Sequence, residues 1–177
     1  GEQGIGDEIM FSSLIPDLHK ACSQLIVKAD KRLIPILRRS FPKDIAFCES
    51  NTPVSEGDYD AHIAMGSLPL HFRPNIESFK TAAQGYLSAD GKRAAVLRDR
   101  LLSDGSKILI GLSWHSTSKI RVAQKRMISL GQLACAFQAE NVKFVSLQYG
   151  DMDDEINRVR QDHGIDVAQV EQIDNFN

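Results

Sequence analysis

Hydrophobic positions in the first half of the chain form short continuous runs separated by longer stretches of helical composition. Short apolar runs are typical of buried strands, and the longer stretches are typical of helices. The elements predicted here are helices over 8–22, 31–41 and 67–72 and strands over 24–28, 45–48 and 60–65. Because Pro16 removes a backbone hydrogen bond and clashes with the preceding turn, we expect a kink or break near Ile15. Asp30 is expected to cap the second helix.

The same alternation restarts after Asp104-Gly105, a pair typical of a helix end. The elements predicted for the second half are helices over 91–102, 129–137 and 152–163 and strands over 107–114, 142–147 and 165–170. Alternating strands and helices of this length favour a parallel sheet with helices on its faces. We therefore predict an α/β fold with two Rossmann-like parallel-sheet units: a first domain over 1–90, a connecting helix over 91–105 and a second domain over 106–177.

A glycine-rich segment opens the chain and runs into the first predicted helix. Gly1, Gly4 and Gly6 lack a Cβ, so their backbone amides can approach a ligand closely. Asp7 stands where the helix N-cap is expected, and its carboxylate can accept hydrogen bonds from the free amides of the first turn. Such a loop usually follows a buried strand, and the residues from Ile165 onward begin a strand without a closing helix. We thus expect a first unit without its opening strand and an incomplete second unit.

Composition and charge narrow the functional classes. With 21 Lys and Arg against 23 Asp and Glu, the chain is near neutral, so no general attraction to nucleic acid or anionic membranes is expected. No apolar run approaches the roughly 18 residues of a membrane span, and no signal peptide pattern opens the chain. The odd, widely spaced cysteines Cys22, Cys48 and Cys135 predict buried free thiols and a reducing, cytoplasmic location. The histidines are too scattered for a metal cluster, so no metal site is expected.

Hydroxyls and cations gather between the predicted strand 107–114 and the helix that follows it. The anion-binding candidates are Ser116, Thr117, Ser118, Lys119, Lys125 and Arg126. Free amides, the helix dipole and guanidinium groups together favour a phosphate at such a place, and the alternative is a solvated basic loop. His115 is either a group that polarises a phosphate or hydroxyl or a solvated loop histidine. Gln148 and Gly150 end the next predicted strand and either contact a nucleotide or turn toward water.

Six short motifs run in order through nearly the whole chain. They are Gly1-Glu-Gln-Gly-Ile-Gly-Asp7, Ser67-Leu-Pro-Leu-His-Phe72, Tyr86-Leu-Ser-Ala-Asp90, Ile110-Gly-Leu-Ser-Trp114, Lys125-Arg-Met-Ile-Ser-Leu130 and Phe144-Val-Ser-Leu-Gln148. In this order and spacing the sequence resembles the glycosyltransferase domain found behind tetratricopeptide repeats in bacterial proteins. That domain is of the glycosyltransferase family 9 type and is related to the lipopolysaccharide heptosyltransferases.

The resemblance implies a GT-B architecture, in which the first domain faces the acceptor and the second holds the nucleotide-sugar. It implies transfer of a sugar from a nucleotide-sugar to a hydroxyl of a glycan, lipid or protein, without a cofactor. Asp7 would be the general base, Gly4 and Gly6 would border the acceptor, and Arg126 would lie near the donor phosphates. Tetratricopeptide repeats would precede the domain in the parent chain. Family segments that complete the donor site fall beyond residue 177, so these residues alone are expected to be inactive.

Two other functions are weighed against the transferase. The glycine spacing at Gly1, Gly4 and Gly6 does not match a dinucleotide fingerprint, and its acidic partner would have to be Asp30, so a nicotinamide enzyme is disfavoured. A non-catalytic α/β binding or scaffolding module of a repeat-containing protein stays open. Binding of nucleoside diphosphates would distinguish that module from a transferase.

Overall fold

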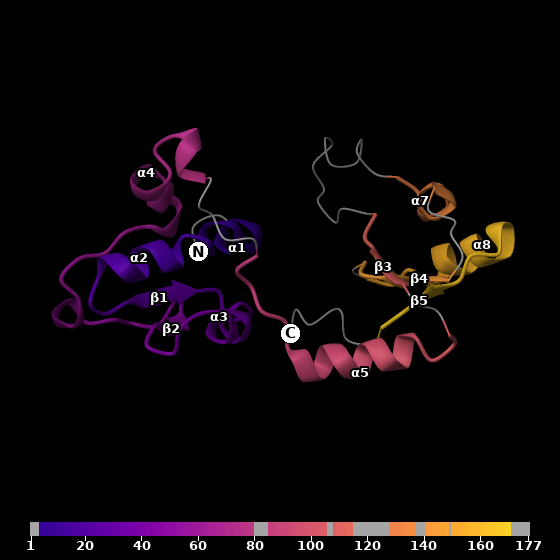
Figure 1. Cartoon of the computed structure of the whole chain (residues 1–177), viewed down its shortest axis with the longest axis horizontal. Coiled ribbons are helices and arrows are strands. Elements are labelled where there is room, and N and C mark those ends of the chain that lie inside the picture. The colour runs from indigo at the N-terminus through magenta and orange to yellow at the C-terminus, as the bar shows by residue number, and fades with distance from the viewer. Residues whose placement is uncertain are drawn as a thin grey trace. The chain divides into compact units, whose positions relative to one another are not determined.

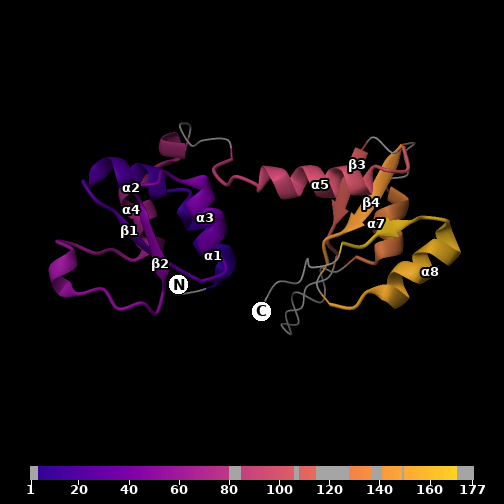
Figure 2. The same ribbon diagram turned by 90° about the horizontal axis from the view of Figure 1, so that it is seen from below.

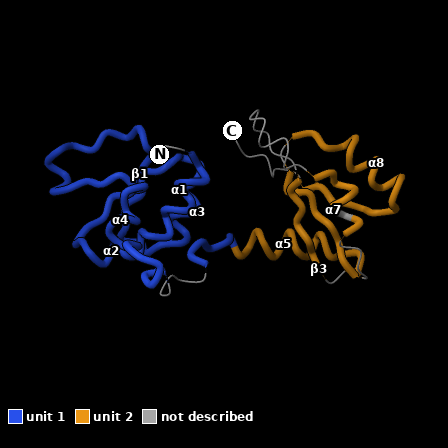
Figure 3. The backbone as a smooth tube through the Cα atoms, turned by 90° about the horizontal axis from the view of Figure 1, so that it is seen from above, with its two compact units in different colours: residues 1–90 blue, residues 91–177 orange. Residues whose placement is uncertain are grey.

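A computed structural model describes residues 4–79, 85–105, 108–114, 128–136, 141–148 and 150–170. The chain divides into two compact units, Gly1–Asp90 and Gly91–Asn177 (Figures 1 and 3). Each unit contains its own parallel sheet and its own cluster of buried apolar side chains. The protein is therefore α/β in both units. No helix in the described ranges has the length and apolar character needed to cross a membrane.

Unit 1 holds a two-stranded parallel sheet and short helices. Its elements are α1 (Ile5–Ser12), α2 (Ile15–Ala21), β1 (Ile26–Ala29), α3 (Ile34–Ser40), β2 (Ala46–Glu49), α4 (Leu68–Phe72) and the 3-10 turns η1 (Glu56–Asp58), η2 (Met65–Ser67) and η3 (Ile76–Phe79). Strands β1 and β2 pair from Ile26 opposite Ala46 to Ala29 opposite Glu49. The connection between them runs through α3, as expected for parallel neighbours.

The predicted break near Ile15 is confirmed. Helix α1 ends at Ser12, and α2 begins at Ile15 with Pro16 in its first turn. A proline is tolerated there because the first amides of a helix have no intrahelical acceptor. The carbonyl of Ile9, near the end of α1, accepts the hydroxyl of Tyr86 and, at 2.7 Å, the hydroxyl of Ser12. The last segment of unit 1, which contains Tyr86, is thus hydrogen-bonded to α1.

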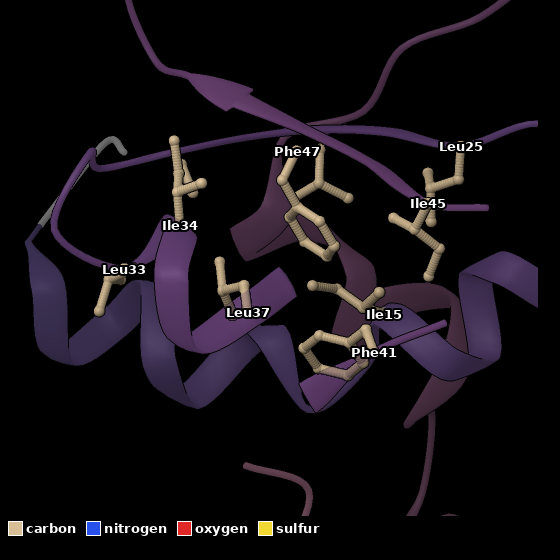
Figure 4. Close-up of a cluster of buried hydrophobic side chains, with 10 residues drawn as sticks. Ile15, Leu25, Leu33, Ile34, Leu37, Phe41, Ile45 and Phe47 are labelled. Atoms are coloured by element: carbon tan, nitrogen blue, oxygen red, sulfur yellow. The ribbon is translucent and has the colours of Figure 1, made fainter. Parts of the chain in front are cut away.

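The core of unit 1 lies between the sheet and helices α2 and α3 (Figure 4). Along β1 the side chains alternate, with Val27 and Ala29 buried while Ile26 is 42% exposed. The first predicted strand is therefore buried on one face only, because a parallel strand needs helices on both sides to be buried on both. The buried cluster consists of Ile15, Leu25, Val27, Ala29, Leu33, Ile34, Leu37, Phe41, Ile45 and Phe47.

Two predictions for unit 1 are wrong in detail. Residues 60–64 form no strand, and Ile63 is 40% exposed. This segment contains two alanines and a histidine, so pairing it with the sheet would bury little apolar surface. Asp30 does not cap α3, which begins at Ile34 with Leu33 in the cap position. The Asp30 carboxylate is instead used inside the turn that follows β1.

Unit 2 contains a three-stranded sheet in the order β3-β4-β5 with all strands parallel. Its elements are α5 (Gly91–Leu101), β3 (Ile108–Leu112), α7 (Leu130–Ala136), β4 (Val142–Ser146), α8 (Asp153–His163) and β5 (Val167–Ala168). Helices α7 and α8 lie side by side (Figures 1 and 2), and their side chains join those of the sheet in one cluster around Leu130, Phe144 and Val159. Helix α8 ends at His163 and is capped by Gly164, which has a left-handed conformation with φ of 65°.

The cysteines differ from the expectation in their exposure. All three are free thiols, as predicted, but Cys22 and Cys135 are exposed and Cys48 is half-buried. Cys22 lies at the end of α2, where its thiol donates to the carbonyl of Leu18 at 3.2 Å. The prediction of burial is therefore wrong for Cys22 and Cys135, because number and spacing along the chain do not show which side of an element a residue faces.

Candidate functional site

The start of α1 carries the predicted acceptor-side residues. Gly4, and not Asp7, occupies the N-cap position, and the cap has no side-chain hydrogen bond. Gly4 has φ of 151° and ψ of 170°, a conformation that is essentially restricted to glycine. Asp7 is the third residue of the helix. The expected capping role of Asp7 is therefore wrong, because the helix begins at Ile5, three residues earlier than the predicted start at residue 8.

Asp7 is half-buried in the first turn of α1. Its carboxylate makes no hydrogen bond or ion pair with any residue in the described ranges. A carboxylate whose oxygens are not engaged by the protein can accept a hydrogen bond or a proton from a bound hydroxyl.

Glu8, the next residue, has a different environment. Its side chain is 8% exposed, and its Oε2 accepts the backbone N–H of Asp30 at 2.8 Å. Glu8 lies on the inward face of α1 with Ile5, Ile9 and Ser12, a spacing of three and four residues. The sequence analysis missed this residue. The signal was an acidic side chain at a position where the helical period expects an apolar one.

The turn after β1 is held by its own side chains as well. The Asp30 Oδ1 accepts hydrogen bonds from the backbone N–H and the Nε–H of Arg32, both at 2.9 Å. Its Oδ2 accepts a hydrogen bond from the Nη2–H of Arg32 at 2.8 Å. The Arg32 side chain, and then its backbone N–H, hold the pKa of the Asp30 carboxyl well below its usual range. The residue after β1 is thus held by Glu8 through its backbone N–H and by Arg32 through its carboxylate.

In unit 2, Gln148 lies at the carboxyl end of the sheet and is 6% exposed. Its Oε1 accepts the backbone N–H of Trp114 at 3.0 Å and the hydroxyl of Ser113 at 3.4 Å. The backbone N–H of Gln148 donates to the Ser146 hydroxyl at 3.3 Å. The alternative of a side chain turned toward water is therefore wrong, and the side chain joins the ends of β3 and β4. Its contact with a nucleotide, and that of Gly150, stay predictions.

Glu155 of α8 is a second residue that the sequence analysis missed. Its Oε2 accepts the indole N–H of Trp114 at 2.9 Å, and its Oε1 accepts the backbone N–H of Leu130 at 3.1 Å. The carboxylate thereby joins Trp114, the second residue after β3, to the first residue of α7. A buried tryptophan usually has a partner for its indole N–H, and this was the available signal.

The predicted donor-phosphate residues lie outside the described ranges. They are Ser116, Thr117, Ser118, Lys119, Lys125 and Arg126, together with His115. Their roles therefore stay predictions from the sequence. Within the part of the chain that the structure describes, no group of three or more His, Cys, Asp or Glu residues could hold a metal ion.

Comparison with known proteins finds one relevant similarity. The chain is 30% identical over 190 residues to Protein FlbA of Caulobacter vibrioides, and the match covers 98% of this chain and 31% of that protein. The chain thus spans less than one third of the length of this relative. No protein-family model matches the chain, and no solved structure matches it. The resemblance to glycosyltransferases accordingly stays a prediction.

Proposed function

We propose that this chain is the part of a glycosyltransferase that contains the acceptor-side unit and the first elements of the nucleotide-sugar-binding unit. The observation that carries the proposal is the contrast between two adjacent carboxylates. Glu8 is buried and hydrogen-bonded, whereas half-buried Asp7 has no bond to a described residue. Asp7 is not the helix N-cap, so capping does not account for an acidic residue at this position.

The order of the sequence motifs supports the same assignment. Unit 1 begins with the glycine-containing start of α1, and unit 2 has polar side chains where two parallel strands end. In open α/β sheets, ligands bind at the carboxyl ends of the strands. A GT-B arrangement, with a nucleotide-sugar held mainly by unit 2, is part of this proposal.

The proposed reaction is a displacement at the anomeric carbon of the donor. Asp7 takes the proton of an acceptor hydroxyl as the hydroxyl oxygen bonds to the anomeric carbon. The bond from that carbon to the diphosphate oxygen breaks, and its electron pair leaves with the nucleoside diphosphate. Cations such as Arg126 would stabilise the negative charge that develops on the diphosphate.

The experiment uses the full-length gene product. UDP-glucose, GDP-mannose and ADP-glucose are tested for binding by thermal shift, and release of the nucleoside diphosphate is measured with an extract of a strain that lacks the gene as the source of unmodified acceptor. We expect one donor class to bind and to turn over. Arg126→Ala should weaken the binding of that donor.

Asp7→Asn should lower the rate of nucleotide release by about 10²- to 10⁴-fold, because general base catalysis contributes about that much. Donor binding and the melting temperature should stay unchanged, since Asp7 has no bond to a described residue to lose. An unchanged rate would refute the role of Asp7. Absence of both nucleotide binding and turnover would favour the non-catalytic binding or scaffolding module.

A further inference from the structure

Glu8 is a buried acidic residue of unit 1, and the proposed reaction does not use it. Its side chain is 8% exposed on the inward face of α1. Burying a carboxylate is costly unless hydrogen bonds compensate for the lost water. Here the backbone N–H of Asp30 and the N-terminal turn of the helix provide that compensation. An apolar residue would fill the same face without that cost.

The hydrogen bond made by Glu8 joins helix α1 to the turn that follows β1. Helix α1 starts without a side-chain cap bond. Asp30 follows β1 directly, and its own carboxylate is occupied by Arg32. The backbone N–H that Glu8 binds therefore belongs to a turn that the hydrogen bonds between Asp30 and Arg32 also stabilise. Through this hydrogen bond the first turn of α1 is fixed to the carboxyl end of β1.

We propose that Glu8 is a positioning residue for Asp7, an inference that rests on the proposed function. Successive residues of an α-helix differ by about 100° around the axis, so fixing the direction of one side chain fixes that of the next. Glu8 takes the inward direction and leaves the carboxylate of Asp7 in a set orientation in the same turn. A helix held only by its apolar side chains could rotate or fray at this end.

The required property of Glu8 is an accepting oxygen and not a titrating group. Glu8→Gln keeps an oxygen that can accept the N–H of Asp30, although an uncharged acceptor is weaker. Glu8→Ala removes the acceptor and leaves that N–H without a partner. These two substitutions separate a positioning role from a catalytic one, because a general base would be lost in both.

The test measures nucleotide release by the full-length gene product with the donor that binds, using the deletion-strain extract as acceptor. Glu8→Gln should stay within about fivefold of the wild-type kcat, because the hydrogen bond is retained. Glu8→Ala should lower kcat by about 10- to 100-fold with an unchanged KM for the donor, since small misplacements of a catalytic group have effects of that size. Glu77→Ala, at an exposed acidic position in η3, serves as the matched control and should match the wild type.

A double substitution separates positioning from a general loss of structure. In the Asp7→Asn background, Glu8→Ala should leave the residual rate unchanged within about twofold, because the group that Glu8 orients is already absent. A further loss of the same size as in the wild-type background would mean that Glu8 acts only on stability.

Two other results would overturn the inference while leaving the transferase intact. A Glu8→Gln variant as inactive as Asp7→Asn would make Glu8 itself the base. A Glu8→Ala variant as active as the wild type would remove its role altogether. A wild-type protein that binds and turns over none of the donors would instead refute the proposed function, and with it this inference.

Discussion

Glu8 in unit 1 and Glu155 in unit 2 do similar structural work in different surroundings. Each carboxylate extends from the first turn of a helix to a residue just after a strand, Asp30 directly after β1 and Trp114 two residues after the end of β3. Glu8 accepts the backbone N–H of Asp30, and Glu155 accepts the indole N–H of Trp114 and the backbone N–H of Leu130. Both are anchors at the carboxyl end of a parallel sheet, where a functional residue is usually sought.

The ends of the two sheets differ in whether a carboxylate is left without a hydrogen bond to a described residue. In unit 2, Gln148 and Glu155 both bind groups of their own unit. In unit 1, Glu8 is engaged in the same way, but the neighbouring Asp7 has no bond to a described residue. An acidic residue at a sheet edge is thus not by itself a catalytic residue. The hydrogen bonds that it already makes separate an anchor from a candidate base.

The largest effect in this comparison is expected from Glu155→Ala. The substitution leaves the indole N–H of Trp114 and the N–H of Leu130 without their acceptor, which should destabilise unit 2 by about 2–4 kcal/mol. Trp114 is the single tryptophan of the 177 residues, so its fluorescence during urea unfolding reports on unit 2. Asp154→Ala, at an exposed acidic position in the same helix turn, is the control and should cost only a few tenths of a kcal/mol.

Equal free energies of unfolding for the Glu155→Ala and Asp154→Ala chains would contradict the role of Glu155 as an anchor comparable to Glu8. It would mean that the contacts of Glu155 contribute nothing beyond an acidic charge near a helix start. Glu155→Gln is expected to fall between them, because only one of its terminal atoms can accept a hydrogen bond.

A smaller effect is expected at the glycines of unit 1. Gly4→Ala should cost about 1–3 kcal/mol, because a φ of 151° is strained for any residue with a side chain, even though a Cβ there meets no atom within 4 Å. Gly6→Ala should be neutral or stabilise the chain by up to about 1 kcal/mol, since Gly6 lies inside α1 and a Cβ there also meets no atom within 4 Å. Urea unfolding followed by far-UV circular dichroism measures both.

The same pair of variants tests the start of the helix. If Gly6→Ala were the more costly of the two, the conformation of Gly4 would not be what limits the residue at that position. The interpretation that α1 starts at a strained glycine without a side-chain cap would then need revision.

The smallest effect concerns pH. Hydrogen bonds from Arg32 lower the pKa of Asp30 in the folded chain, and a hydrogen bond from His19 lowers that of Asp44. The unfolded chain then binds more protons in acid, so both groups stabilise the fold above an unfolded pKa of about 3.9. That stabilisation is lost as the pH falls below this value toward the lower folded pKa.

The pH dependence is measured as the urea midpoint between about pH 6 and pH 3. Asp30→Asn should give a shallower decline than the wild type at the acidic end, because the substituted side chain does not titrate. Glu49→Gln, at an exposed position in β2, is the control. A wild-type curve that Asp30→Asn does not flatten would contradict the lowered pKa of Asp30.

Much of the fold followed from local pattern. The break at Pro16, the strands of both sheets and the helices α5, α7 and α8 were predicted within a few residues, because proline geometry and runs of apolar side chains act over short distances. The strand predicted over 60–65 failed for the opposite reason. Strand formation depends on a partner and on burial, and neither is a local property.

Some features of the candidate site also followed from the sequence, and others depended on the tertiary structure. The sequence by itself determined the α/β class, the position of Asp7 near the start of a helix and the polar residues at the strand ends. Only the tertiary structure decided that Asp7 is not a cap, that Gln148 is buried, and that Glu8 and Glu155 are anchors. For Glu8, Gln148 and Glu155 the reason is that their partners lie 22 to 41 residues away along the chain. A hydrogen bond over such a distance exists only after the sheets have formed.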